Sequence, residues 1–154
     1  AVNYQGAKSF GGTYAQYPPF TAVHIDNVAD SAAQSGSIEV TLEQLGEWNP
    51  DYMFLNAGNM ELMQKDYASN QAFFDNLKAF QAGNLYTQPS YNMNGTNIEI
   101  AICDAYFNGA TVYPDAFSDV DLASTYREIL ETMLGVDCYD QLHAAGLDFG
   151  KISF

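Results

Sequence analysis

The chain has 154 residues, of which 47% are hydrophobic, and this is enough for one domain with a buried core. Nineteen acidic residues against five basic ones give a formal net charge of −14. Because such a surface repels nucleic-acid phosphates, composition excludes nucleic-acid binding. No apolar run is long enough to span a membrane, so we expect no direct membrane insertion of this domain. We expect a single domain over residues 1–154, and a monomer.

The first residues lack the basic start and apolar core of a signal peptide, and the chain has no initiator Met. We therefore interpret it as a mature protein or an excised domain, with any export signal or lipid anchor removed upstream. Cys103 and Cys138 are too few for a disulfide framework and match no zinc or redox spacing. We expect both to be small, buried hydrophobic residues.

Residues 5–20 combine glycines, tyrosines and a Pro-Pro pair without helical or strand periodicity. This pattern predicts a long ordered loop, and loops of that length in compact domains are often functional.

A helix, a tight turn and a buried strand are predicted next. Thr41 and Gln44 form a capping box that starts a helix, and residues 49–50, Asn-Pro, end it. The apolar run 51–55 is too short for a helix and is closed by Asn-Ala-Gly-Asn, which is typical of a fully buried parallel strand.

The second half of the chain continues the alternation of helices and strands. We predict a helix over residues 70–77, a strand over 84–87 and a final helix over 139–145. A second capping box, Thr96 with Glu99, starts a helix whose apolar face comprises Ile98, Ala101, Ile102, Ala105, Tyr106, Gly109 and Val112. Residues 118–121 cap a third long helix that ends at Gly135, with a buried face of Ala123, Tyr126, Ile129, Leu130, Met133 and Leu134. On its exposed side we expect an ion pair between Arg127 and Glu131.

This alternation favours a three-layer α/β sandwich with a mostly parallel central sheet. Ligands of such sheets lie beyond the carboxyl ends of the strands. Loops 5–20, 56–60 and 88–95 are expected at that edge.

No catalytic motif is present: there is no G-x-S-x-G elbow, no H-E-x-x-H, no P-loop and no G-x-G-x-x-G. His24 and His143 stand alone, so we expect structural roles for them. Two carboxylate pairs resemble an acid/base couple, but both lie near predicted helix N-termini, where capping explains them more simply: Asp119 with Asp121, and Asp137 with Asp140. We therefore predict no catalytic residue and no metal ligand.

The remaining polar chemistry lies in loops rich in tyrosine and amide side chains. Tyrosine and asparagine offer flat apolar faces and fixed hydrogen-bonding groups, which suit a binding site without a reactive group. The predicted ligand-binding residues are Tyr14, Tyr17, Asn56, Asn59, Tyr91, Asn92 and Asn94.

Five segments, in order, resemble the substrate-binding proteins of ABC importers for iron siderophores and cobalamin. Residues 41–45, Thr-Leu-Glu-Gln-Leu, followed by residues 49–55, Asn-Pro-Asp-Tyr-Met-Phe-Leu, are similar to that family's s-x-E-x-L … N-P-D-x-I segment. The other similar segments, which carry the match over nearly the whole chain from about Gly11, are residues 27–30, 77–86, 96–117 and 134–139.

The resemblance implies the C-terminal lobe of an extracytoplasmic protein, in the periplasm or lipid-anchored at the cell surface. Such a protein has two α/β lobes, binds an iron-siderophore, haem or corrinoid chelate between them, and delivers it to a membrane permease. It implies that Glu43 is the permease-docking residue and that no residue here ligates the metal directly. The N-terminal lobe and the connecting helix are absent from these 154 residues.

Two alternatives remain open. A secreted carbohydrate-active or carbohydrate-binding domain would use the tyrosines to stack on sugars. A lobe of the same family could instead bind an oxyanion such as molybdate, although the few basic residues weigh against that.

Overall fold

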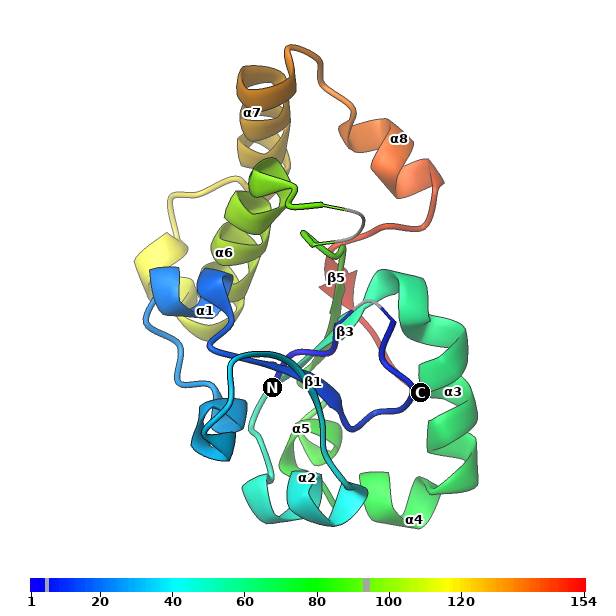
Figure 1. The fold of residues 1–154 in the computed structure, drawn as a ribbon. Coiled ribbons are helices and arrows are strands. Elements are labelled where there is room, and N and C mark those ends of the chain that lie inside the picture. The colour runs from blue at the N-terminus through cyan, green and yellow to red at the C-terminus, as the bar shows by residue number, and fades with distance from the viewer. Residues whose placement is uncertain (5, 93–94) are drawn as a thin grey trace.

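The computed structural model describes residues 1–4, 6–92 and 95–154. Helices cover both faces of a central sheet, which confirms the predicted three-layer α/β class (Figure 1). Among the described residues, no helix is long and apolar enough to cross a bilayer.

The central sheet contains β3 (Met53–Asn56), β4 (Leu85–Gln88) and β5 (Gly150–Lys151), in that order. β3 and β4 are parallel, whereas β5 is antiparallel to β4. A parallel bridge between Val2 and Phe54 extends the sheet on the other side of β3. The two strands predicted from the sequence are confirmed, and all four residues of β3 are buried.

Alternation along β3 divides the core into two parts. Met53 and Leu55 belong to one hydrophobic cluster, and Phe54 belongs to the other. Successive side chains of a strand point to opposite faces, so each face of the sheet needs its own helical cover. This is why the chain folds into three layers.

Four helices lie on the face of Met53 and Leu55: α2 (Leu42–Trp48), α3 (Met60–Ser69), α4 (Gln71–Phe74) and α5 (Lys78–Gln81). The helix predicted over residues 70–77 is therefore shorter than expected. The chain breaks the helical pattern before Leu77, whose extended backbone precedes α5.

The opposite face is covered by α1 (Pro18–Ala22), α6 (Ile98–Val112), α7 (Leu122–Leu134) and α8 (Tyr139–Ala144). The described residues also form three 3₁₀ turns: η1 (Val28–Ala32), η2 (Ala57–Asn59) and η3 (Pro114–Phe117). Both cysteines are free, and Cys103 is buried while Cys138 is half-buried.

The prediction of a long loop over residues 5–20 is wrong in its second half. β1 (Gly12–Ala15) pairs antiparallel with β2 (Gly36–Glu39), and α1 follows directly. Pro18 and Pro19 occupy the start of α1, where a missing backbone N–H leaves no helical bond unmade. Local sequence patterns did not predict β1, because its pairing partner, β2, lies more than twenty residues further along the chain.

Capping predictions had mixed outcomes. The Thr41 hydroxyl accepts a 3.1 Å hydrogen bond from the backbone N–H of Gln44, so half of the first capping box is formed, while the Gln44 side chain instead bonds Glu47. The second box is not formed, because α6 starts after Asn97 without a side-chain cap. Asp121 caps α7 as predicted.

The buried faces of the two long helices differ from those predicted. α6 buries Ile100, Cys103, Asp104, Phe107, Asn108 and Gly109, so only Gly109 of the predicted face is buried. α7 buries Tyr126 and Leu130, whereas Met133 and Leu134 are 48% and 49% exposed near its end. Periodicity finds an apolar face but does not show which element covers it, and α6 is apolar on two sides.

Candidate functional site

The carboxyl edge of the parallel strands is where this type of sheet places ligands. Asn56 and Gln88 are register partners at the ends of β3 and β4, so they mark that edge. The chain leaves the Val2 bridge toward Tyr4 in the same direction. Residues that follow these three points form the candidate site.

Buried amides hold the rim of this edge together. Asn59 Nδ2 donates hydrogen bonds to Asn3 Oδ1, at 2.8 Å, and to the carbonyl of Tyr4, at 2.6 Å. Asn3 Nδ2 in turn donates to the carbonyl of Gly12, at 2.6 Å. Asn56 Oδ1 accepts a hydrogen bond from the backbone N–H of Gly58. Both predicted asparagines are thus buried and bonded within the fold.

Three predicted tyrosines lie together at this edge. Ring centroids of Tyr14 and Tyr17 are 5.6 Å apart, those of Tyr17 and Tyr91 are 5.6 Å apart, and those of Tyr14 and Tyr91 are 6.3 Å apart. They come from β1, the start of α1 and the segment after β4, so three elements build this tyrosine cluster. Tyr17 and Tyr91 are buried, and Tyr14 is half-buried.

The other predicted residues are dispersed. Asn92 is half-buried and accepts a hydrogen bond from the Ser90 hydroxyl. Asn94 lies outside the described residues. Glu43 is exposed in the first turn of α2.

A buried polar group that sequence reasoning missed lies behind Tyr17. The Tyr17 hydroxyl donates a 2.6 Å hydrogen bond to Asp104 Oδ2 and accepts one of 2.9 Å from Gln88 Nε2. Asp104 has no exposed surface, and burial raises the pKa of its carboxyl well above its ordinary value. The sequence did contain a signal for this buried group, because an aspartate lies within the apolar stretch 98–112.

Several atoms of this group have no hydrogen-bond partner. They are Gln88 Oε1, Asp104 Oδ1, and both Oδ1 and Nδ2 of Asn108, which lies one turn further along α6. All three side chains are at most 1% exposed. Buried polar atoms are almost always paired with protein or water, so the unpartnered atoms of these three side chains can each form a further hydrogen bond.

The buried phenols act as neutral groups. Burial, and then the nearby Asp104 carboxyl, raises the pKa of Tyr17 well above its ordinary value. The pKa of Tyr91 is also raised, first by burial and then by Tyr14. Within the described part of the chain, no group of three or more His, Cys, Asp or Glu residues is placed to hold a metal ion.

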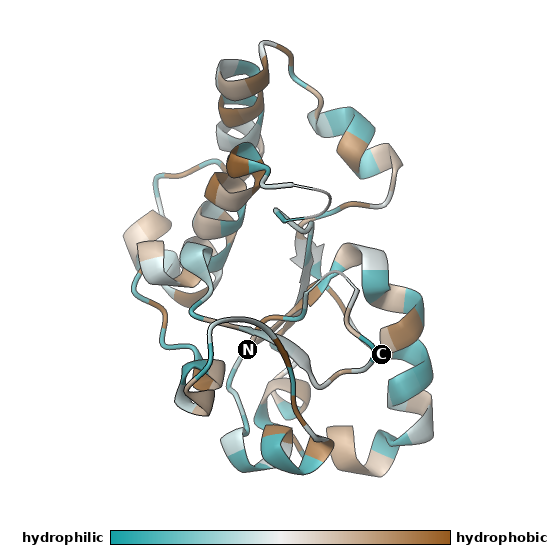
Figure 2. Ribbon diagram, in the orientation of Figure 1, coloured by the Kyte–Doolittle hydropathy of each residue, from teal (hydrophilic) through white to brown (hydrophobic). Residues whose placement is uncertain are grey.

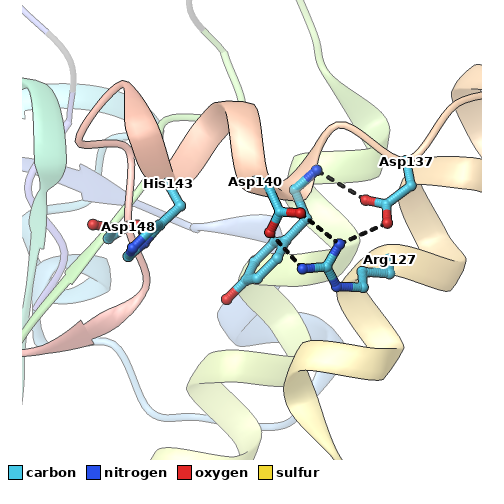
Figure 3. Close-up of polar contacts among 6 residues, drawn as sticks. Arg127, Asp137, Asp140, His143 and Asp148 are labelled. Carbon is cyan, nitrogen blue, oxygen red and sulfur yellow. Dashed lines mark hydrogen bonds and ion pairs between the residues drawn. The ribbon is translucent and has the colours of Figure 1, made fainter.

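The carboxylates considered as an acid/base pair belong instead to a structural clamp between α7 and α8 (Figure 3). Arg127 Nη1 binds Asp137 Oδ2 at 2.7 Å, and Nη2 binds Asp140 Oδ1 at 2.5 Å, so the predicted pair with Glu131 is wrong. The backbone N–H of Tyr139 and then Arg127 hold the pKa of Asp137 below its ordinary value. His143 lies against Asp148 at the other end of α8.

An apolar groove of about 470 Å³ runs between α1, α6 and η3. Four of its lining residues belong to the α6 face that was predicted to be buried: Ala101, Ile102, Ala105 and Tyr106. Pro18 of α1 and the Phe117 ring of η3 also line the groove. None of the three clustered tyrosines is among the residues that line this groove.

No model of a known protein family matches this sequence, and no curated protein matches it. Solved structures do. The molybdate periplasmic binding protein MolA of Haemophilus influenzae, bound to molybdate, is 20% identical and superposes with a TM-score of 0.69 over 88% of this chain and 42% of its own. The chain has the fold of one lobe of a periplasmic solute-binding protein. A periplasmic solute-binding protein of Veillonella parvula is 19% identical, with a TM-score of 0.68 over 95% of this chain and 46% of its own.

A third similar structure is the Ni-His complex of CeuE from Helicobacter pylori, which is 16% identical with a TM-score of 0.68 over 96% of this chain and 47% of its own. The lobe thus spans less than half the length of each of these proteins. MolA is bound to molybdate and CeuE to Ni-His, so structures with this fold hold different ligands. At such low identity the likeness establishes the fold, while the ligand has to be argued from this chain's own residues.

Proposed function

We propose that this lobe is the C-terminal part of the extracytoplasmic substrate-binding component of an ABC importer, and that it binds a metal chelate. The observation that carries the proposal is the tyrosine cluster of Tyr14, Tyr17 and Tyr91 at the carboxyl edge of the sheet. Aromatic faces supply apolar contact to an organic chelator, and the phenol and amide groups around them supply directed hydrogen bonds.

A second lobe is proposed to close the site. The chain covers 42–47% of the three solved structures described above, which leaves room for a second domain of similar size. Large hydrophobic residues are also exposed at the start of α6 and near the end of α7: Ile98, Met133, Leu134 and Val136. Figure 2 shows hydrophobic segments on the helices of this side of the molecule. Exposed apolar residues are a feature of surfaces that another domain covers.

The proposed role is binding and delivery without catalysis. The chelator, a siderophore, haem or corrinoid, holds the metal, and Tyr14 and Asn92 offer the most accessible contacts of the described site residues. Glu43, exposed in the first turn of α2, is proposed to dock on a positively charged surface of the permease.

Titration of the 154-residue chain tests this proposal. The probes are a ferric hydroxamate, a ferric catecholate, haem, cobalamin and molybdate. Binding of each probe is measured by calorimetry and by the fluorescence of Trp48 and the tyrosines. Tyr14→Ala is expected to weaken binding at least about tenfold, as loss of an aromatic anchor does. Tyr113→Ala, which removes an exposed tyrosine outside the cluster, is the matched control and is expected to leave affinity unchanged. No response to any chelate would refute the proposal.

Oxyanion binding is the second candidate, and it is favoured by one observation, the likeness to MolA bound to molybdate. In this lobe the tyrosine cluster contains no basic side chain. Saturable heat with molybdate and none with the chelates would establish the oxyanion function instead.

A further inference from the structure

We infer that Asp104 is the counter-charge of a positively charged N–H donor, either a pendant ammonium group of the transported chelate or a free ammonium ion, which binds behind the tyrosine cluster. The inference rests on the proposed function, because it adds a cationic subsite to the same binding edge.

Geometry is the first support. Asp104 and Gln88 both bond the Tyr17 hydroxyl, at 2.6 and 2.9 Å, so the carboxyl and the amide group lie beside the same buried atom. Neither Asp104 Oδ1 nor Gln88 Oε1 has a partner, and Asn108 Oδ1 adds a third unpartnered oxygen one turn along α6. An ammonium group has three N–H donors and no acceptor, which matches three unpartnered oxygens.

The charge around the site is the second support. The groups that influence Asp104 or are influenced by it are all uncharged at neutral pH: Tyr17, Tyr91, Cys103 and Tyr126. The five cationic side chains lie elsewhere. Lys65 pairs with Glu61, Lys78 with Asp51, and Arg127 with Asp137 and Asp140. Lys151 lies over the Tyr86 ring, and Lys8 is exposed in the loop before β1.

A carboxyl buried without a cationic partner is costly to ionise, so Asp104 keeps its proton in the empty lobe. A cation that arrives beside it changes this balance. The carboxylic acid then releases its proton to solvent, and the carboxylate and the ammonium group form a charge-assisted hydrogen bond. The rings of Tyr17 and Tyr91, 5.6 Å apart at their centroids, add faces that attract a cation.

Access requires a movement of the tyrosine cluster, because Tyr91 is 7% exposed and Tyr17 is 5% exposed. Tyr17 is held by its two hydrogen bonds.

A matched pair of chelates tests the inference. Ferrioxamine B carries a pendant ammonium group, whereas cyclic ferrioxamine E presents the same iron hydroxamate without one. We expect the wild-type chain to bind ferrioxamine B about tenfold more tightly, a typical gain for a partly buried charge pair, and to release close to one proton as it does so. Calorimetry in two buffers of different ionisation enthalpy measures both quantities.

Asp104→Asn keeps the size and the hydrogen bond from Tyr17 while it removes the charge. It is expected to bind both ferrioxamines equally and to release no proton. Asp115→Asn, which changes an exposed aspartate on η3, is the control and is expected to behave as wild type. Circular dichroism establishes that both variants are folded.

Ammonium chloride, with potassium chloride as its control, separates the two sources of the cation. Stabilisation of wild type by ammonium alone, absent in Asp104→Asn, together with equal binding of the two ferrioxamines, would assign the site to the free ion. Equal ferrioxamine affinities with no ammonium effect would overturn the inference and leave the proposed function standing. If the lobe bound none of the metal chelates in the titration panel, both would fall.

Discussion

The Tyr17 hydroxyl donates a 2.6 Å hydrogen bond to Asp104, a fully buried carboxyl that lies 87 residues further along the chain. This bond links the start of α1 to the middle of α6 directly below the tyrosine cluster. The position of Tyr17, and through it the shape of the proposed site, therefore depends on a residue that is itself fully buried.

Stability is expected to fall with rising pH because of Asp104. Burial raises the folded-state pKa of this carboxyl above its ordinary 3.8, so the folded chain retains a proton that the unfolded chain has lost. The associated stability is complete below about pH 4 and decreases as pH rises toward the folded-state pKa. Asp104→Asn should remove this dependence and increase the free energy of unfolding at pH 8 by roughly 1–3 kcal/mol. Urea denaturation of both chains at pH 4.5, 6 and 8 provides the measurement, and parallel curves would contradict it.

A buried and an exposed residue of α7, one turn apart, should respond differently to truncation. Leu130 is 1% exposed within the core, so Leu130→Ala is expected to cost about 2–5 kcal/mol of unfolding free energy. Met133 lies 48% exposed one turn further on, and Met133→Ala is expected to change stability by less than about 0.5 kcal/mol. Equal losses in chemical denaturation would show that α7 is buried along its predicted face after all.

The Arg127 clamp should govern the local opening of α8. Arg127→Lys retains a positive charge but lacks the planar fork that meets Asp137 and Asp140 together. Amide protons of α8 are expected to exchange roughly threefold faster or more, with little change in those of α3. Lys65→Gln, which breaks the exposed pair with Glu61, is the control and should leave α8 unchanged. Hydrogen exchange followed by mass spectrometry resolves the two helices.

Substitution of Glu43 should weaken permease docking without changing the stability of the fold. Glu43→Ala leaves the core of α2 intact, so its thermal midpoint should equal that of wild type while ligand-stimulated ATP hydrolysis by the importer falls several-fold. Glu47→Ala, on the same helix and also exposed, is the matched control. Equal stimulation by all three forms would remove Glu43 from the docking surface.

Local patterns predicted much of the framework. The helices over 42–48, 98–112, 122–134 and 139–144 and the strands β3 and β4 were expected within a few residues of their observed bounds. Each of these elements carries its own signal, such as the Thr41 cap, the run of buried residues in β3, or Gly135, whose positive φ of 74° ends α7. Loops 5–20 and 88–95 were expected at one edge of the sheet, and the tyrosines of these two segments do meet, although Tyr14 lies within β1 rather than in a loop.

The sequence by itself determined the fold class and the elements whose caps and periodicity are local, since those interactions join residues a few positions apart. Only the tertiary structure decided which side of α6 is buried, that β1 pairs with β2, that Arg127 meets Asp137 and Asp140, and that Asp104 lies beneath Tyr17. Each of these depends on contacts between distant segments, and such contacts leave no periodic trace in the chain. The proposed cationic subsite belongs to this second group, because its oxygens come from β4 and α6 and meet only when the sheet is covered.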